Sequence, residues 1–321
     1  MLNFPSIFES VSDLDKGQID ALLLLAHKFK NRVSHTTDFT KAKPTICTLF
    51  LENSTRTKHS FQMASEHLGG YFFDFDVKSS SFSKGENLEE TLLTLKCQGV
   101  DLCIIRSNEN NHLERLKAAP PLRIINGGDG TNEHPTQALL DLFTMQEIEG
   151  DLNGKRVCIV GDSNHSRVAN SLIKLLPLYG VEVSLAGPKE FADQCAKKHG
   201  LKHFEKSSEY LKECDIVYLL RAQLERHTTG DKAAHQNLLI SYNKDYGLNS
   251  QALKEAGTNQ SIYHPGPCNI GIELTHELMR TSSYKGYEQV KHSIFMRMAI
   301  IQSILQNGDK NVGKFTNLST N

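Results

Sequence analysis

Runs of apolar residues alternate with segments of helical periodicity along most of the chain. In its first half, the apolar runs predict strands at residues 44–51, 70–75, 100–106 and 122–126. The intervening segments predict helices at about 54–68, 88–98, 111–118 and 135–149. Because the strands are continuous apolar runs, they are typical of parallel strands that helices cover on both faces.

Residues 147–155, EIEGDLNGK, interrupt this pattern with a polar stretch that contains two glycines. The second series predicts strands at 156–161, 181–187, 215–220 and near 261–267, and helices at about 166–178, 189–199 and 288–306. We therefore expect an α/β protein with two βαβ domains, each a parallel sheet flanked by helices, and a cleft between them. The predicted domains are residues 1–134 with a returning C-terminal helix at 288–308, and residues 135–287.

Composition narrows the class of protein. The 321 residues are 39% hydrophobic and 23% charged, with a formal net charge of −1, so a packed core is expected, and nucleic acid and acidic membranes are not expected partners. The N-terminus lacks a signal-peptide pattern, and the longest aliphatic run near it, residues 21–26, is too short to cross a bilayer. The seven cysteines form no CxxC pair, which favours buried, reduced thiols. We expect a soluble, cytoplasmic protein.

A polar cluster, Ser54-Thr55-Arg56-Thr57, follows the first predicted strand and begins a helix. Ligands of open α/β sheets bind at the carboxyl ends of strands, and the first amides of a helix have no partner within it. With three hydroxyls and a guanidinium added, these amides suit a doubly charged phosphate. The alternative is simple N-capping by Ser54 or Thr55, which would leave Arg56 unexplained. The sequence contains neither a P-loop nor a glycine-rich dinucleotide fingerprint.

Polar residues also follow other predicted strands of the first half. The third strand ends in Arg106, which either binds an anion or simply meets solvent. The fourth strand leads through a glycine-rich turn to His134 and Gln137, which share a helical face, and His134 is either functional or structural. The polar loop before the second helix presents Ser80 and Lys84, and it is either a binding segment or only a loop.

The second half repeats this arrangement. Arg167 follows its first strand, Arg221 and Gln223 follow its third, and residues 264–267, HPGP, form a rigid stretch with free carbonyls. The candidate ligand-binding edges of both domains are therefore positive, although the whole chain is not. This predicts a phosphate-bearing substrate on the first domain and a carboxylate-bearing substrate on the second. No cluster of residues has the spacing of metal ligands.

Six motifs together resemble the catalytic chains of the aspartate carbamoyltransferase family. In order they are STRT (54–57), KGE (84–86), HPTQ (134–137), the arginine after GDSNHS, RAQLER (221–226) and HPGP (264–267). The resemblance covers nearly the whole chain, and the motifs are far more specific jointly than singly. It implies transfer of the carbamoyl group of carbamoyl phosphate to the α-amine of L-aspartate, the committed step of de novo pyrimidine biosynthesis, without cofactor or metal.

The resemblance also implies roles for the residues that match the motifs. Those that would hold the phosphate are Ser54, Thr55, Arg56 and Thr57. Those that would contact the carbonyl oxygen are Thr55, Arg106 and His134. The rest of the carbamoyl group would meet Gln137 and the backbone carbonyls of Pro265, Gly266 and Pro267. The residues expected to be catalytic are Arg56, Thr57, Lys84, Arg106 and His134.

On the second domain, the resemblance implies that Arg167, Arg221 and Gln223 hold the carboxylates of L-aspartate, with help from Lys84. Ser80 and Lys84 would reach the site of a neighbouring subunit, which implies a homotrimer with shared active sites. Regulatory chains and a dihydroorotase are further partners that the resemblance leaves open. Many family members have an arginine where this chain has Ile270.

Two alternatives remain at this level. One is a related transcarbamylase, such as ornithine carbamoyltransferase, which would need an acidic group for the second amine of its substrate. The other is a catalytically inactive homologue that serves as an assembly partner, which would be expected to lack residues of the phosphate site.

Overall fold

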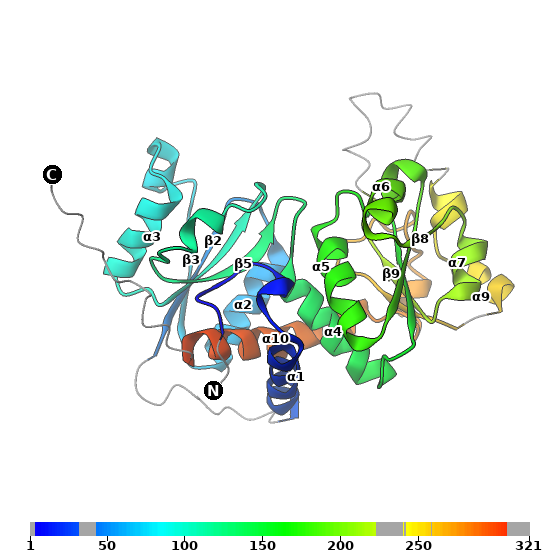
Figure 1. Cartoon of the computed structure of the whole chain (residues 1–321), viewed down its shortest axis with the longest axis horizontal. Helices are drawn as coiled ribbons and strands as arrows, with labels where there is room; N and C mark the ends of the chain where they lie inside the picture. The colour runs from blue at the N-terminus through cyan, green and yellow to red at the C-terminus, as the bar shows by residue number, and fades with distance from the viewer. Residues whose placement is uncertain (1–3, 32–42, 223–239, 241, 258, 307–321) are drawn as a thin grey trace. The chain divides into compact units, whose positions relative to one another are not determined.

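The computed structural model describes residues 4–31, 43–222, 240, 242–257 and 259–306. The chain forms two compact units, coloured along the sequence in Figure 1. The first unit holds the described residues up to Phe143 and those from Val290 onward, and the second unit is Thr144–Gln289. The boundary between the units therefore falls inside two helices, α4 (Pro135–Glu149) and α10 (Gly286–Gln306).

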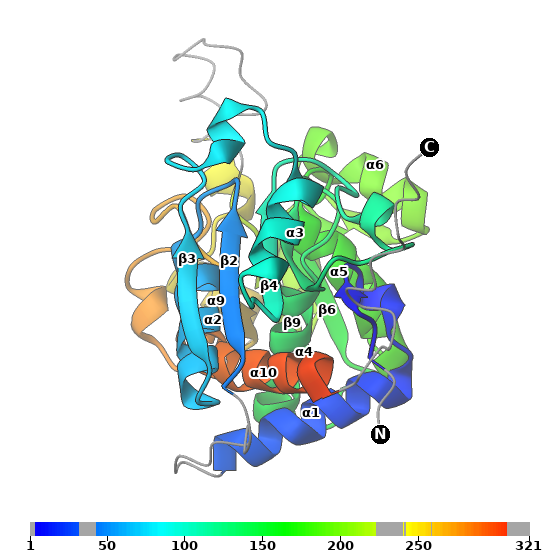
Figure 2. The same ribbon diagram turned by 90° about the vertical axis from the view of Figure 1, so that its left-hand side faces the viewer.

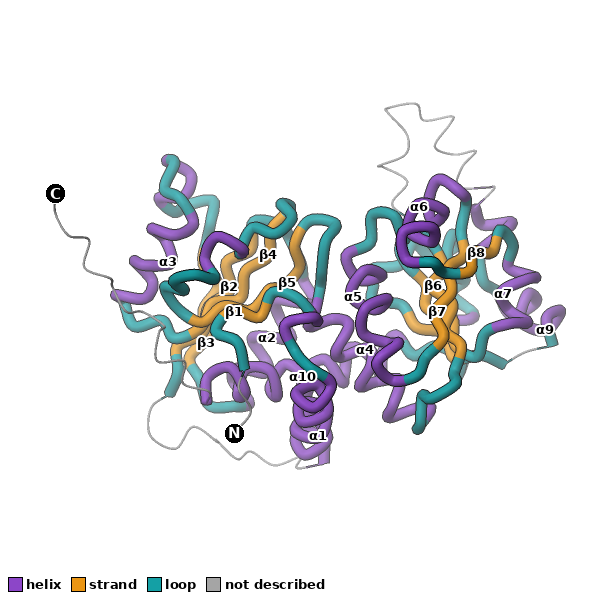
Figure 3. The backbone as a smooth tube through the Cα atoms, in the orientation of Figure 1, coloured by secondary structure: helices purple, strands orange, loops and turns teal. Residues whose placement is uncertain are grey.

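A parallel five-stranded sheet forms the centre of the first unit (Figure 3). Its strands are β1 (Ile7–Phe8), β2 (Thr45–Phe50), β3 (Tyr71–Phe75), β4 (Leu102–Ser107) and β5 (Arg123–Asp129). Their order across the sheet is β1-β5-β4-β2-β3. The chain runs from β2 outward to β3 and then returns to the other side of β2, so the connections diverge between β2 and β4. Such switch points are where open α/β sheets bind ligands.

Successive residues of a strand point to opposite faces of the sheet, so apolar strands place side chains on both faces, and helices cover them. The helices of the first unit are α1 (Lys16–Asn31), α2 (Thr55–His67), α3 (Leu88–Cys97), most of α10 and the start of α4. On one face, Leu92 and Leu95 of α3 share a buried cluster with Cys47 and Leu49 of β2. Three short 3-10 helices complete the unit: η1 (Val11–Asp13), η2 (Ser81–Lys84) and η3 (Glu114–Leu116).

Strand β3 lies at the edge of the first sheet beside β2 (Figure 2). The expectation that every strand is covered on both faces is wrong here, because no residue of β3 is buried. Tyr71 is 61% exposed and Phe73 is 37% exposed. The edge of the first unit therefore presents aromatic surface to its surroundings.

The second unit contains another parallel five-stranded sheet, with the order β10-β9-β6-β7-β8. Its strands are β6 (Arg156–Val160), β7 (Glu182–Ala186), β8 (Lys202–Phe204), β9 (Ile216–Leu219) and β10 (Ser261–Tyr263). Its helices are α5 (Arg167–Leu175), α6 (Lys189–His199), α7 (Ser207–Glu213) and α9 (Ser250–Ala256), with 3-10 helices η4 (Leu176–Tyr179) and η6 (Leu278–Arg280). Here the connections diverge between β6 and β9, so the second sheet has its own switch point.

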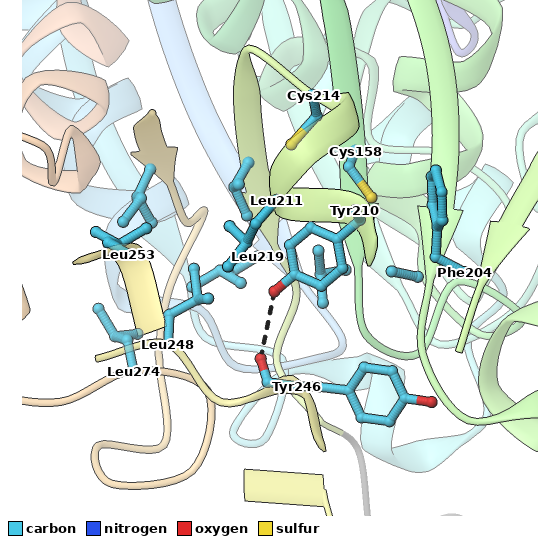
Figure 4. Close-up of a cluster of buried hydrophobic side chains, with 14 of the residues drawn as sticks. Cys158, Phe204, Tyr210, Leu211, Cys214, Leu219, Tyr246, Leu248, Leu253 and Leu274 are labelled. Carbon is cyan, nitrogen blue, oxygen red and sulfur yellow. Dashed lines mark hydrogen bonds between the residues drawn. The ribbon is translucent and has the colours of Figure 1, made fainter. Parts of the chain in front are cut away.

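A buried cluster joins the strands and helices of the second unit (Figure 4). It includes Cys158 of β6, Leu219 of β9 and Tyr210 of α7. The Tyr210 hydroxyl donates a hydrogen bond to the backbone carbonyl of Tyr246 at 3.5 Å, so this ring meets its polar need inside the core. The contact ties α7 to the segment that precedes α9.

The predicted fold class is confirmed: each of the two α/β units holds a parallel sheet flanked by helices. The helix predicted at 111–118 is wrong in extent, because only the 3-10 helix η3 forms there. Asn111 has a positive φ of 54°, which a continuous α-helix does not accommodate. The expectation of buried thiols holds for five cysteines, whereas Cys97 is exposed and Cys268 is half-buried.

Among the described residues, no helix is both long enough and apolar enough to cross a bilayer.

Candidate active site

Three predicted site segments leave neighbouring strands of the first sheet. Ser54–Thr57 follow β2, Arg106 lies near the end of β4, and His134 follows β5. Because β5, β4 and β2 are adjacent and parallel, their carboxyl ends lie side by side at the same end of the sheet. The switch point between β2 and β4 lies among these carboxyl ends.

The start of α2 does not use its polar residues for ordinary capping. Ser54 occupies the N-cap position with extended backbone, yet its side chain accepts no capping hydrogen bond from the helix. Thr55 and Arg56 are exposed, and the first turn contains no acidic residue. The alternative that Ser54 serves only as a cap is therefore not supported. The positive end of the helix dipole faces a cluster of hydroxyls and a guanidinium.

Thr57 and His134 are brought together from separate segments. The Thr57 hydroxyl oxygen lies 3.5 Å from Nε2 of His134, and both residues are buried. One turn into α4, the Gln137 amide nitrogen donates to a carboxylate oxygen of Asp141 at 2.9 Å. The start of α2 and the start of α4 therefore belong to one polar constellation.

Arg106 does not reach solvent as a strand end often does. Its side chain is only 11% exposed and lies within the first unit. Its Nη1 donates to the backbone carbonyl of Gly127 at 3.2 Å, and its Nη2 donates to a carboxylate oxygen of Glu52 at 3.3 Å. These contacts fix the plane of the guanidinium, which makes Arg106 a held donor group rather than a solvated one.

Arg297 is a buried cation that the sequence reasoning did not identify. It lies on α10, is 2% exposed, and donates from Nη1 to the hydroxyl of Ser60. Its guanidinium also stacks over the Phe61 ring, with 4.9 Å to the ring centroid. Figure 1 shows α10, in red-orange, beside α2. The available signal was a lone arginine in the apolar stretch IFMRMAII, residues 294–301.

The contacts of Arg297 reach the first turn of α2. The Ser60 hydroxyl donates to the carbonyls of Arg56 and Thr57 at 2.6 and 3.0 Å. Burial lowers the pKa of the Arg297 guanidinium to about 9, while the charge of Asp141 acts in the opposite direction. A buried positive group therefore lies close to the start of α2. Its charge is stabilised by Asp141, the same carboxylate that Gln137 contacts.

The loop with Ser80 and Lys84 leaves the edge strand β3, not one of the three central strands. Ser80 is the N-cap of η2: its hydroxyl donates to the carbonyl of Val77 at 2.8 Å and accepts from the amide of Phe82 at 3.3 Å. Lys84 is exposed at the end of η2. The loop is thus held by its own hydrogen bonds, and it follows the edge strand, β3, in which no residue is buried.

In the second unit, the predicted residues again follow neighbouring strands. Arg167 is the first residue of α5, after β6, and Ser166 caps that helix by accepting from the amide of Ala169 at 3.1 Å. Arg221 follows β9 and is exposed. Gln223 lies outside the described residues. Since β6 and β9 flank the switch point, Arg167 and Arg221 stand at the edge where a ligand is expected.

The HPGP segment follows β10, the next strand in the same sheet. The His264 amide donates to the side-chain oxygen of Gln289 at 2.9 Å, and the Gly266 amide donates to Nδ1 of His264 at 2.8 Å. The peptide bond between Gly266 and Pro267 is cis. Pro265 and Gly266 are half-buried and Pro267 is exposed, so this turn stands partly open to a ligand.

The buried side chain of Glu273 connects the segment after β9 with the segment after HPGP. One carboxylate oxygen accepts from the Ala222 amide at 2.8 Å and from the Asn269 side chain at 2.9 Å. The other oxygen accepts from the Asn269 amide. Burial raises the pKa of the Glu273 carboxyl to about 7, against these hydrogen bonds, which lower it. The residue after Arg221 is thereby tied to the segment that follows HPGP.

In the part of the chain that the structure describes, no group of three or more histidine, cysteine or acidic side chains could hold a metal ion.

Two segments of the chain match the two domains of one protein family. Residues 7–147 match the carbamoyl-P binding domain of the aspartate/ornithine carbamoyltransferases, and residues 153–304 match the Asp/Orn binding domain. The aspartate carbamoyltransferase catalytic subunit of Ligilactobacillus salivarius is 39% identical over 304 residues, which cover 93% of this chain and 95% of that protein. The same subunit from Streptococcus pneumoniae is 36% identical, with 94% and 96% covered.

Solved structures give the same picture. The catalytic subunit of M. Jannaschii aspartate transcarbamoylase matches with a TM-score of 0.81 at 29% identity, covering 94% of this chain and 99% of that one. Aspartate transcarbamoylase from Trypanosoma cruzi, in complex with carbamoyl aspartate and phosphate, matches with a TM-score of 0.79 at 26% identity, covering 94% and 96%. Two matching domains in the family's order, near-full-length relatives and the shared fold lead to one conclusion: the chain belongs to the aspartate/ornithine carbamoyltransferase family.

Proposed function

We propose that this chain transfers the carbamoyl group of carbamoyl phosphate to the α-amine of L-aspartate, giving N-carbamoyl-L-aspartate and phosphate. The observation that carries the proposal is the convergence of Ser54–Thr57, Arg106 and His134 at the ends of three adjacent strands. The family membership and the names of the relatives support the same reaction.

The start of α2 is the proposed phosphate site. The uncapped Ser54 hydroxyl, the exposed Arg56 and the first amides of the helix supply donors where the helix dipole is positive. Thr57 lies deeper, next to His134, and would bridge the phosphate and the carbamoyl group. Lys84 of a neighbouring subunit would add a second positive charge.

Arg106 and His134, with Thr55, are the proposed donors to the carbonyl oxygen. This oxygen gains negative charge when the amine attacks, and donors that are already held in place stabilise that charge without reorganising. Gln137 commits its amide nitrogen to Asp141, which leaves its amide oxygen as the acceptor for the carbamoyl nitrogen. The backbone carbonyls around Pro265, Gly266 and Pro267 are further proposed contacts of the carbamoyl group.

Arg167, Arg221 and Gln223 are the proposed partners of the two aspartate carboxylates. Arginine suits this task because its fork of donors matches a carboxylate. Ornithine would instead present a second amine, and the matching positions of the second unit carry cations. The presence of Arg56, Lys84, Arg106 and His134 likewise argues against an inactive homologue.

The chemical step needs no covalent enzyme intermediate. The neutral α-amine forms a C–N bond to the carbonyl carbon, and the tetrahedral intermediate then breaks its C–O bond to phosphate. The departing phosphate oxygen accepts the amine proton, so no protein base is required. Positioning of two substrates contributes up to about 7–11 kcal/mol to lowering such a barrier.

We further propose a homotrimer that works in the cytoplasm, in the committed step of de novo pyrimidine biosynthesis. The exposed aromatic residues of β3 support the oligomer, because edge strands with exposed apolar side chains are uncommon on monomeric proteins. The same strand leads directly into the loop with Ser80 and Lys84. Seven cysteines without a disulfide suit a reducing compartment. Mass measurement of the native assembly would show whether regulatory chains or a dihydroorotase join it.

A product assay tests the proposal. Carbamoyl aspartate should form from carbamoyl phosphate and L-aspartate, and Arg56→Ala should reduce kcat/KM by about 100-fold or more, because one charged donor to the transition state is lost. Arg115→Ala, which removes an exposed arginine from η3, is the matched control and should leave kcat/KM unchanged. Carbamoyl transfer to ornithine in preference to aspartate, or no transfer by the unaltered chain, would contradict the proposal.

A further inference from the structure

The strand that leads toward His134 carries a β-bulge opposite Arg106. Ile105 pairs with Asn126 and Ser107 pairs with Asp129, so β5 has one residue more than β4 over this interval. Bulges re-aim the chain and are common next to active sites. The carbonyl that accepts from Arg106, that of Gly127, lies inside this bulge.

The side chain of Asn126 holds the bulge from within. Asn126 has no exposed surface, and its side-chain oxygen accepts from the Gly128 amide at 2.7 Å. Its side-chain nitrogen donates to the carbonyl of Glu9 at 2.8 Å and to a carboxylate oxygen of Asp129 at 3.0 Å. Backbone groups that the irregular strand would leave unpaired are thereby satisfied.

Asp129 then closes the turn that ends at His134. One oxygen of this fully buried carboxylate accepts from the Glu133 amide at 2.9 Å as well as from Asn126. The other oxygen accepts from the Asn111 amide at 2.9 Å and from the Asn132 side chain at 3.0 Å. Four donors around one carboxylate make a strongly held centre.

Two further features limit movement of this turn. Glu133 is anchored outside it, since one carboxylate oxygen accepts from the Ser10 hydroxyl at 2.5 Å and the other from the Val11 amide at 3.3 Å. The Asn110 side-chain oxygen holds the turn from another side, since it accepts from the Thr131 amide at 2.8 Å. The turn therefore has little freedom to adopt another path.

We infer that Asn126 and Asp129 are positioning residues for the carbamoyl-transfer site, an inference that rests on the proposed function. They act through other groups: Asn126 fixes the Gly127 carbonyl that orients the Arg106 guanidinium, and Asp129 fixes the turn that presents His134. Both targets are the proposed donors to the carbonyl oxygen, not the groups at the start of α2. Disturbing the pair should therefore weaken recognition of the carbonyl while sparing recognition of phosphate.

The test compares two probes in titrations: inorganic phosphate, and phosphonoacetamide, which adds a carbonyl and an amide to a phosphonate. Asp129→Asn keeps the shape of the side chain but replaces one acceptor with a donor. It should weaken phosphonoacetamide binding by about 10-fold or more while changing phosphate binding by less than about 3-fold. The accompanying fall in kcat should be about 10- to 100-fold, as for a small misplacement of catalytic donors.

Ser65→Ala is the matched control, because it removes a buried hydrogen bond of α2, to the carbonyl of Phe61 at 2.7 Å, away from the bulge. It should leave both affinities and kcat unchanged. If Asp129→Asn does not fold, Ser10→Ala gives a milder test at the outer end of the same network, with a selective loss of about 2- to 5-fold.

Equal weakening of both probes, or no weakening of either, would overturn the positioning inference while the proposed function stands. An unaltered chain that binds both probes yet transfers nothing to aspartate would refute the proposed function, and the ratio of affinities would still decide the inference. Failure of the unaltered chain to bind either probe would refute both.

Discussion

A carboxyl group without exposed surface joins two loops of the second unit. Glu273 accepts hydrogen bonds from the Ala222 amide and from Asn269, and burial nonetheless raises the pKa of its carboxyl from 4.5 to about 7. A raised pKa means that the folded state favours the protonated form. Folding therefore gains from this group below about pH 4.5, and the gain is lost as pH rises through about 7.

The prediction for this residue is a pH-dependent effect of Glu273→Gln. The neutral variant should gain stability relative to the unaltered chain between pH 5 and pH 8, by up to about 3 kcal/mol, because it avoids burying a charge. Denaturant unfolding of both proteins at several pH values measures the difference. Glu277→Gln, at an exposed site, should show no such trend. A stability difference that is constant with pH would contradict this account.

Individual residues also show where sequence reasoning stops. The segment Ser54–Thr57 could be located because hydroxyls and an arginine at a strand end are unusual, and the structure confirms its place at the start of α2. Whether Arg106 is buried or solvated could not be read from the sequence, since that depends on Glu52 and on a carbonyl 21 residues away. Roles in binding stay predictions for all of these residues.

Among the elements, most helices and strands with a clear apolar pattern were predictable, including the edge strand β3, and the shortest strands were not. Helices α4 and α6 begin and end where the periodicity predicted, whereas β1 and β8 have two and three residues and leave no period to detect. The bulge in β5 was also beyond prediction, because it is defined only by pairing with β4. Helix α1 was missed although five of its apolar residues share a buried face.

The pairing of α10 with α2 gives a prediction at this scale. Arg297→Met roughly keeps the volume of the side chain but removes a buried cation that the charge of Asp141 stabilises, so the free energy of unfolding should fall by about 3 kcal/mol. The double variant with Asp141→Asn should lose less stability than the sum of the two single variants, because the two opposite charges attract each other and either change alone removes that attraction. Chemical denaturation of the single and double variants measures the coupling.

Arg280→Met is the control, because Arg280 is exposed at the end of η6. It should change stability by less than about 0.5 kcal/mol. Strict additivity of Arg297→Met and Asp141→Asn would show that the two charges do not interact across the first unit.

For the whole molecule, the proposed trimer makes a complementation experiment decisive. Chains with Arg56→Ala and chains with Lys84→Ala should each be nearly inactive. When the two are mixed, dissociated and reassembled in equal amounts, roughly a quarter of the sites should combine an intact Arg56 with an intact neighbouring Lys84. Activity should therefore return to about a quarter of the normal value. A control mixture of Arg56→Ala chains with themselves should recover nothing.

Failure of the mixed chains to regain activity, with trimers present by mass measurement, would show that each subunit supplies its own Lys84. A monomer in solution would contradict the shared site directly. Exposed Tyr71 and Phe73 should also become protected from solvent on assembly if β3 contributes to the contact.

The first unit draws on both ends of the polypeptide, and this has a consequence for biosynthesis. Translation delivers the part of α10 from Val290 onward only after every residue of the second unit has already been made. Until then Ser60 and Phe61 lack the arginine that covers them in the finished chain. On the ribosome, the nascent first unit therefore stays incomplete while the second unit emerges.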